Sequence, residues 1–174
     1  MGIILPKIVV VTGAESTGKS TLVKELAHHL EAKYYPEFAR DYITNLKHSY
    51  TFEDVEFIAR EQARQYEEAL NSNHSFIIFD TWLIVTCVWM EVVYNKKPTW
   101  LVEYIRQAKI DLFLLCDTNI PWVDDPVREN GGKMREILHE KYKEELLSYP
   151  FKFEIISGIG KPRIESGLSF LKKF

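Results

Sequence analysis

A glycine-rich segment near the N-terminus constrains the fold of this chain more than any other feature. Residues 13–20 read Gly-Ala-Glu-Ser-Thr-Gly-Lys-Ser and match the pattern G-x-x-x-x-G-K-[ST] at every defined position. An apolar run, residues 8–11, precedes this segment, and an amphipathic pattern with a leucine at every fourth position from Leu22 to Leu30 follows it. A strand, a tight turn and a helix in this order are the context in which the pattern forms a P-loop. The sequence therefore predicts a phosphate-binding loop that opens a helix.

The residue types in this loop explain how it would hold phosphate. Gly13 and Gly18 let the backbone bend so that successive N–H groups point at a β-phosphate, and the helix that follows adds the positive end of its dipole. Lys19 can reach the β- and γ-phosphates, and the Ser20 hydroxyl can coordinate Mg²⁺. We therefore expect ATP and Mg²⁺ to bind here. The predicted nucleotide-binding residues are Gly13, Ala14, Glu15, Ser16, Thr17, Gly18, Lys19, Ser20 and Thr21, with Arg135 farther along the chain.

Strand-like and helical patterns alternate along the rest of the chain. The runs expected to be strands are continuously apolar, as in a sheet covered on both faces, so the alternation predicts an α/β fold with a parallel sheet and right-handed crossovers. No linker or repeat divides the chain, and we expect a single domain over residues 1–174. The expected strands are 8–11, 75–79, 111–116 and 153–156, with a weaker candidate at 33–35, and the expected helices are 19–31, one that begins at Thr51 with a Thr51–Asp54 capping box, 83–94, 99–109, 133–147 and 163–173.

Composition excludes several classes of function. The formal net charge is −3, which argues against the clustered basic surface of a non-specific nucleic-acid-binding protein. Cys87 and Cys116 lie in apolar runs, which indicates buried free thiols in a reducing compartment. We find no signal-peptide pattern at the N-terminus and no apolar stretch long enough to cross a membrane. The expected location is the cytoplasm, and the expected partner is a small molecule.

Two carboxylates stand where the expected strands end. Asp80 follows four apolar residues, which is the form of a Walker B strand whose carboxylate holds Mg²⁺ together with Ser20. The alternative is that Asp80 only caps the next helix. Glu37 follows the weaker strand and has Arg40 three residues later, a pair that can orient an acceptor hydroxyl and bind a phosphate oxygen. The alternative is a surface ion pair of little energy.

The segment 117–135 is rich in polar and turn-forming residues and carries Arg128 and Arg135 around Gly131-Gly132. A mobile segment with arginines can close over ATP, exclude water and stabilise charge on the transferred phosphoryl group. The alternative is an ordinary surface loop. Aromatic residues near the active end are candidates for the acceptor pocket, with Trp82 nearest to it and Trp89 more typical of a core.

Four segments together resemble the ribosylnicotinamide kinase domain of the NadR family. They are the P-loop, Glu37-Phe38-Ala39-Arg40, Phe79-Asp80-Thr81, and Pro121-Trp122-Val123-Asp124-Asp125 with Arg128, in family order. The resemblance covers almost the whole chain and implies a five-stranded parallel sheet of the nucleoside/nucleotide-kinase type with a short lid. It implies transfer of the ATP γ-phosphate to the 5′-hydroxyl of nicotinamide riboside. It also implies that Glu37 and Arg40 face the acceptor, that Asp80 serves the metal or the hydroxyl, and that Arg128 belongs to the lid. The expected catalytic residues are Lys19, Glu37, Asp80 and Arg128.

One position departs from the family pattern. Family members carry an aromatic residue immediately before the glutamate of the Glu-aromatic-small-Arg motif, and this chain has Pro36 there. Tyr35, Phe38 and Trp82 are the candidates for the missing ring platform, so Tyr35 and Trp82 are included among the expected acceptor-binding residues. The longer proteins of the family also carry adenylyltransferase and DNA-binding regions that this sequence lacks. Two other functions remain open, a kinase for a nucleotide or another metabolite and an ATPase module without an acceptor.

Overall fold

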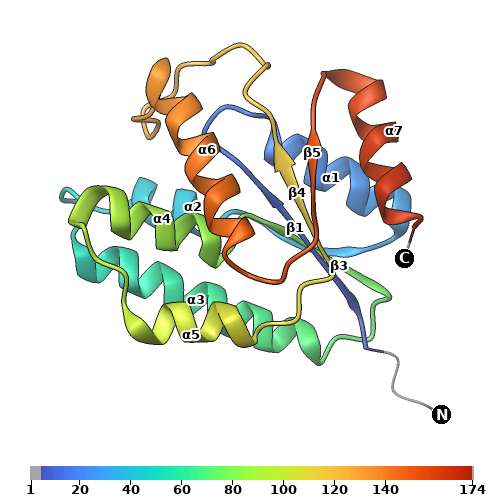
Figure 1. The fold of residues 1–174 in the computed structure, drawn as a ribbon, viewed down its shortest axis with the longest axis horizontal. Coiled ribbons are helices and arrows are strands. Elements are labelled where there is room, and N and C mark those ends of the chain that lie inside the picture. The colour runs from blue at the N-terminus through green and yellow to red at the C-terminus, as the bar shows by residue number, and fades with distance from the viewer. Residues whose placement is uncertain (1–4, 174) are drawn as a thin grey trace.

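The apolar runs of the sequence form one parallel sheet in the computed structural model, which describes residues 5–173. The sheet has the strand order β2-β3-β1-β4-β5, so the first strand lies at its centre (Figure 1). Its strands are β1 (Lys7–Thr12), β2 (Lys33–Tyr35), β3 (Phe76–Asp80), β4 (Leu112–Cys116) and β5 (Phe153–Ile156), and all neighbours pair in parallel. The predicted five-stranded parallel α/β fold is confirmed.

Helices fill the connections between the strands. They are α1 (Lys19–Leu30), α2 (Phe38–Asn45), α3 (Phe52–Leu70), α4 (Leu83–Tyr94), α5 (Thr99–Gln107), α6 (Lys133–Leu147) and α7 (Gly160–Leu171). The expected capping box is present at the start of α3, where the Thr51 backbone N–H donates to the Asp54 carboxylate at 2.8 Å and the Asp54 N–H donates to Thr51 Oγ1. Each of these two hydrogen bonds provides a partner for a backbone N–H group that has none within the first turn of the helix.

Successive side chains along each strand belong to two hydrophobic cores, one on each face of the sheet. On one face, β1, β3 and β4 contribute Ile8, Ile77 and Phe113 to a core covered by α3, α4, α5 and α6. On the other face, Val9 and Ile78 pack against α1 and α7. Figure 1 shows the same three layers, with α1 and α7 on one side of the strands. Because side chains alternate along a strand, burial on both faces explains why the strand sequences are continuously apolar.

Helix α2 is the element that the sequence patterns did not predict. None of its eight residues is buried, although Phe38 and Tyr42 pack against Phe57 of α3, with ring centroids 6.2 Å and 5.1 Å from the centroid of Phe57. The helix spans only eight residues, which is shorter than the window over which apolar periodicity identifies a helix. Its position matters because Glu37 stands at its N-cap, directly after β2.

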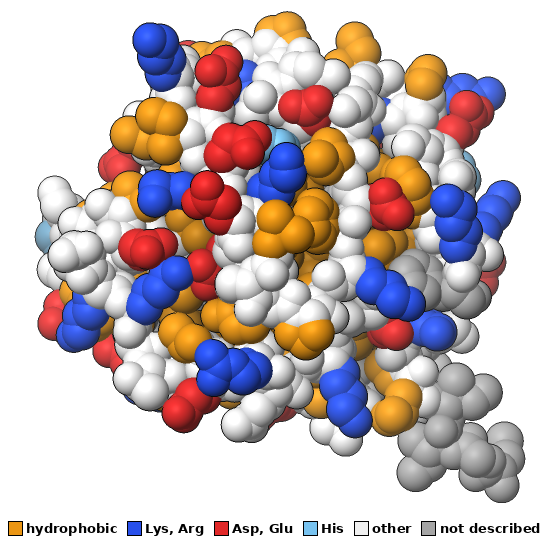
Figure 2. All heavy atoms as spheres, in the orientation of Figure 1, with side chains coloured by type: hydrophobic (Ala, Val, Ile, Leu, Met, Phe, Trp, Pro, Cys, Tyr) orange, Lys and Arg blue, Asp and Glu red, His pale blue; other side chains and the backbone are white. Residues whose placement is uncertain are grey.

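The surface carries interspersed charges. Lys and Arg side chains lie among Asp and Glu side chains over the face in Figure 2, with no continuous basic area there. Within the part of the chain that the structure describes, no helix is long and apolar enough to cross a membrane.

Candidate active site

The P-loop connects the end of β1 to α1 and depends on a close approach to β4. Gly13 has a φ of 138°, and a Cβ atom at this position would lie 2.8 Å from the backbone oxygen of Cys116. Gly18, at the N-cap of α1, has a φ of 72°. Glycine adopts these positive φ values without steric cost, and at position 13 it also leaves room for the neighbouring strand. The loop is thus fixed where the carboxyl ends of the central strands meet.

Bonds inside the loop hold its shape. Thr17 Oγ1 donates to the carbonyl of Ala14 at 2.7 Å, and Lys19 Nζ donates to the same carbonyl at 2.8 Å. Lys19 is largely buried, with 8% of its surface exposed. A buried ammonium group bonded to one carbonyl keeps two further donors for other oxygens. These donors are available to a bound phosphate.

Two arginines hold the loop from outside. The Arg135 guanidinium, in α6, donates to the carbonyls of Ser16, at 2.8 Å, and Ile120. The Arg163 guanidinium, in α7, donates to the carbonyls of Thr17 at 2.6 Å and Gly158 at 2.9 Å. Both arginines are buried. Arg135, which the sequence analysis expected to bind the nucleotide, instead donates to backbone carbonyls of the loop and of Ile120, and it does not line the main cavity. Arg163 was missed because nothing in the sequence near it points to the loop.

The segment between β4 and α6 lies over the P-loop and is bonded to it by loop side chains. The Glu15 carboxylate accepts from the backbone N–H groups of Glu129 at 3.1 Å and Asn130 at 2.8 Å, and Ser16 Oγ accepts from Val123 N–H at 2.9 Å. Two variable positions of the P-loop motif therefore position the segment that the sequence identified as a candidate lid.

The same segment is bonded to α2 by an ion pair. Arg40 donates to the Asp125 carboxylate, and this bond holds the pKa of Asp125 below its usual range. Arg128 donates to the Val123 carbonyl within the segment and lines the main cavity described below. The ion pair between Asp125 and Arg40 therefore connects the segment between β4 and α6 to α2.

Asp80 ends β3 beside the loop and is buried. Among the described residues, its Oδ1 atom is enclosed and has no hydrogen-bond partner. Burial raises the pKa of Asp80, while the Ser20 hydroxyl and the Lys19 ammonium act in the opposite direction. Ser20 and Asp80 line the same smaller cavity. An unpaired carboxylate oxygen beside a hydroxyl is a donor set that suits a hard cation such as Mg²⁺.

No group of three His, Cys, Asp or Glu side chains within residues 5–173 is placed to hold a metal ion. A Mg²⁺ ion in kinase sites is bound by one or two protein groups together with water and substrate phosphates. Ser20 and Asp80 fit this arrangement, in which the nucleotide supplies the remaining ligands.

Two adjoining cavities meet at the loop. The main cavity has a volume of about 520 Å³ and is lined by the P-loop, Glu37, Arg40, the middle of α3 and one face of α4. The smaller one, about 230 Å³, contains Asp80. Ser20, Glu37 and Arg40 line both. The structure therefore brings Glu37, Arg40, Asp80, Arg128 and the loop together, as the sequence predicted.

Part of the main cavity is lined by residues that the sequence did not assign to a site. Tyr50 and Trp89 meet edge to face with ring centroids 4.9 Å apart, and Tyr142 contributes a third aromatic side chain. Gln62 of α3 and Thr86 of α4 add two buried polar groups. We refer to this part, formed by Tyr50, Gln62, Thr86, Trp89 and Tyr142, as the aromatic recess. Trp89 packs against the core, as the sequence indicated, and also forms part of the cavity wall.

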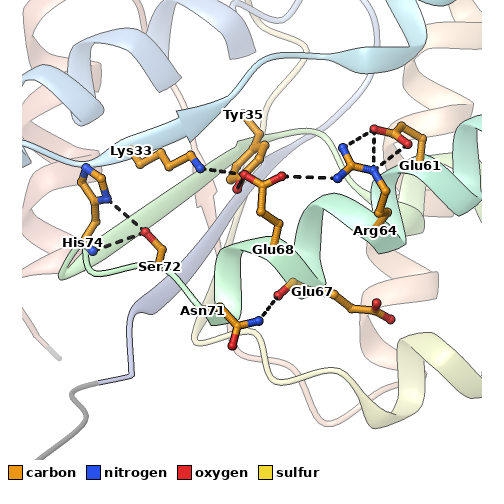
Figure 3. A network of polar contacts seen from close by, with 9 residues as sticks. All are labelled: Lys33, Tyr35, Glu61, Arg64, Glu67, Glu68, Asn71, Ser72 and His74. Atoms are coloured by element: carbon orange, nitrogen blue, oxygen red, sulfur yellow. Dashed lines mark hydrogen bonds and ion pairs between the residues drawn. The ribbon is translucent and has the colours of Figure 1, made fainter.

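Two expected acceptor-binding residues lie elsewhere. The Tyr35 ring stacks on Phe79 with centroids 4.8 Å apart, and its hydroxyl donates to Glu68 of α3 at 2.8 Å. Figure 3 shows this hydroxyl within a network that also joins Lys33 and Arg64 to Glu68. Trp82 is completely enclosed between Tyr66 and Phe113. Neither side chain lines either cavity, so both assignments to the acceptor pocket are corrected.

The fold, the loop and the adjoining cavities define a P-loop domain of the nucleoside/nucleotide-kinase type. The chain belongs to the AAA domain family, whose model matches residues 8–163. Within that family it corresponds to the C-terminal kinase region of NadR. It is 26% identical over 152 residues to the trifunctional NAD biosynthesis/regulator protein NadR of Salmonella typhimurium, a match that covers 82% of this chain and 37% of that protein.

Solved structures of related kinases share the fold of this chain. A NadR protein in complex with NR superposes with a TM-score of 0.80 at 25% identity, over 98% of this chain and 52% of that one. A deoxyadenosine kinase from M. mycoides with dCMP and dCDP bound has a TM-score of 0.66 at 19% identity, over 95% of this chain and 98% of that one. The chain thus spans about a third of the curated NadR relative and about half of the solved NadR chain.

Proposed function

We propose that this chain is an ATP-dependent small-molecule kinase that phosphorylates the 5′-hydroxyl of a nucleoside, with nicotinamide riboside as the favoured acceptor. The observation that carries the proposal is the main cavity, whose wall includes the P-loop, Glu37 and the aromatic recess. A γ-phosphate at Lys19 and a nucleoside in the recess would meet beside Glu37, and such positioning is the main requirement of phosphoryl transfer. The similarity to a NadR protein solved with NR supports this choice of acceptor.

The reaction makes one phosphorus–oxygen bond and breaks another. The acceptor oxygen attacks the γ-phosphorus, the bond to the β-phosphate oxygen breaks to release ADP, and the hydroxyl proton passes to a carboxylate. Glu37 and Asp80 both line the smaller cavity beside Ser20 and are the candidates for that carboxylate. Lys19 and Arg128 face the main cavity and supply positive charge for the phosphoryl oxygens. Mg²⁺, when held by Ser20 and Asp80, supplies further neutralisation of phosphate charge.

The distribution of cations favours a nucleoside over a nucleotide as acceptor. Lys19, Arg40 and Arg128 are the Lys and Arg side chains on the main cavity wall within the described chain. Lys19 and Arg128 serve the ATP phosphates in this proposal, and Arg40 is paired with Asp125. A phosphorylated acceptor would need additional cations to balance its charge. The aromatic recess instead offers rings and uncharged polar groups.

The proposal is tested by coupled detection of ADP with a panel of nucleosides, nucleotides and no acceptor. Nicotinamide riboside should accelerate ADP release well above the rate without acceptor. Glu37→Ala should lower the acceptor-dependent kcat/KM by about 10²- to 10⁴-fold, the range of general-base and orienting groups, and leave Mg·ATP affinity unchanged. Glu165→Ala, which removes an exposed carboxylate of α7, is the matched control. ADP release that is indifferent to every nucleoside would contradict the proposal and indicate an ATPase module.

A further inference from the structure

A buried pair of uncharged polar side chains stands in the aromatic recess. Gln62 of α3 and Thr86 of α4 are 3% and 1% exposed, and both line the main cavity. Along α3, the neighbours of Gln62 one turn away are the buried apolar residues Ile58, Ala59 and Tyr66. Burying an amide in an apolar face is unfavourable unless its hydrogen bonds are made. The presence of Gln62 at this position therefore needs a reason.

The hydrogen bonds of this pair are only half made within the protein. Thr86 Oγ1 donates to Gln62 Oε1 at 2.6 Å, which fixes the orientation of the amide. Among residues 5–173, Gln62 Nε2 has no hydrogen-bond partner, yet it is not one of the fully enclosed polar atoms that lack one. The amide nitrogen is therefore open to the cavity. A side-chain amide nitrogen carries two N–H donors, and a threonine oxygen that donates its proton keeps lone pairs to accept.

The surroundings of the pair limit what can bind there. Tyr50 and Trp89 provide aromatic surfaces, and Val85 and Tyr142 add uncharged groups. The Tyr50 hydroxyl donates to the Glu129 carboxylate at 3.1 Å, so this ring is held by a residue of the segment between β4 and α6. The charged side chains Lys19, Glu37 and Arg128 reach the cavity from other elements, namely the start of α1, the N-cap of α2 and the segment between β4 and α6. Aromatic walls with a few convergent polar groups are typical of sites for planar heterocycles. A carboxamide on such a ring complements the pair, because its oxygen accepts from Nε2 and its NH₂ donates to Thr86 Oγ1.

We propose that Gln62 and Thr86 form the subsite that reads the carboxamide-like edge of the acceptor's heterocycle and thereby determine acceptor specificity. This inference rests on the proposed nucleoside kinase function. It assigns to α3 and α4 a role separate from that of Glu37, since the pair selects the base and does not touch the reacting hydroxyl.

The test compares Gln62→Leu, Thr86→Val and Gln62→Glu with the control Gln65→Leu, which lies on α3 but not on the cavity wall. Binding of nicotinamide riboside and of nicotinic acid riboside is measured by titration calorimetry, and kcat/KM by ADP release. Loss of the amide should weaken nicotinamide riboside binding about 10- to 100-fold, as expected for a buried hydrogen-bonding group, with Mg·ATP affinity within about twofold of the parent. Gln62→Glu should disfavour nicotinic acid riboside more than nicotinamide riboside, because two carboxylates would then face each other.

The outcomes separate this inference from the proposed function. Binding and turnover that are unchanged in Gln62→Leu and Thr86→Val would overturn the subsite and leave the kinase function standing. Nucleoside binding that depends on Gln62 without any acceptor-dependent ADP release would support the subsite and overturn the kinase function. Absence of nucleoside binding to the parent protein would overturn both. A purely structural role for Gln62 would lower the melting temperature without the added discrimination against nicotinic acid riboside expected for Gln62→Glu, and would overturn the subsite.

Discussion

Replacement of Gly13 by alanine should separate two reasons for a glycine in the P-loop. The positive φ at this position costs a non-glycine residue about 1–3 kcal/mol. The new Cβ would also lie 2.8 Å from the Cys116 carbonyl of β4, which adds about 1–3 kcal/mol for displaced packing. Gly158 is the matched control, because its φ is +80° and a Cβ there meets nothing within 4 Å. The Gly158→Ala variant should therefore carry only the backbone term.

Thermal unfolding followed by circular dichroism measures the difference. For a chain of this size, 1 kcal/mol corresponds to about 2–4 °C, so Gly13→Ala should melt about 2–12 °C below Gly158→Ala. Titration calorimetry should also show weaker Mg·ATP binding for the Gly13 variant, because relief of the clash moves the loop away from β4. Equal melting temperatures for the two variants would refute the argument that contact with Cys116 requires the glycine.

Three further predictions concern side chains whose surroundings the structure defines. Arg163→Met should weaken Mg·ATP binding about 10- to 100-fold by calorimetry, because it leaves the Thr17 carbonyl without its donor; affinity equal to the parent would contradict this. Trp82→Phe should lower the melting temperature by about 2–8 °C and leave the acceptor KM unchanged, since Trp82 is a core residue. A raised acceptor KM would indicate instead that Trp82 contacts the acceptor. Burial raises the pKa of Asp80 above its ordinary value of 3.8. The contribution of this group to folding stability is therefore fully present below pH 3.8 and is lost as the pH rises through the raised pKa. Asp80→Asn should therefore raise the melting temperature of the metal-free protein at pH 7, with a gain that vanishes near pH 3.8, and should cut Mg²⁺-dependent turnover about 10- to 100-fold. A gain that persists below that pH would contradict the assigned cause.

The sequence predicted those parts of the fold and site that are encoded locally. The P-loop is a contiguous motif between a strand and a helix, and Asp80 directly follows an apolar run, so both could be placed without knowledge of packing. The strands were found because burial on both faces leaves an unbroken apolar run. Glu37 was placed because it follows the weaker candidate strand at 33–35 and matches the Glu-aromatic-small-Arg motif of the NadR family.

What the sequence did not predict depends on contacts between distant segments. Gln62 and Thr86 lie 24 residues apart and meet only because α3 packs on α4. Tyr35 was misassigned because local sequence does not reveal its partners, the Phe79 ring on which it stacks and the Glu68 carboxylate to which its hydroxyl donates. Trp82 was misassigned because Thr81 has a φ of 63°, a left-handed turn that local patterns do not reveal and that directs the chain into the core.

The shared use of Glu15 and Ser16 has a thermodynamic consequence for the lid segment. Both residues belong to the loop expected to grip phosphate, and both accept hydrogen bonds from the backbone of the covering segment at Val123 and Asn130. Nucleotide affinity and the free energy of lid docking are then coupled, and the coupling acts equally in both directions. A ligand that rearranges these two side chains changes the free energy of lid docking. Docking of the lid segment changes the binding free energy of that ligand by the same amount.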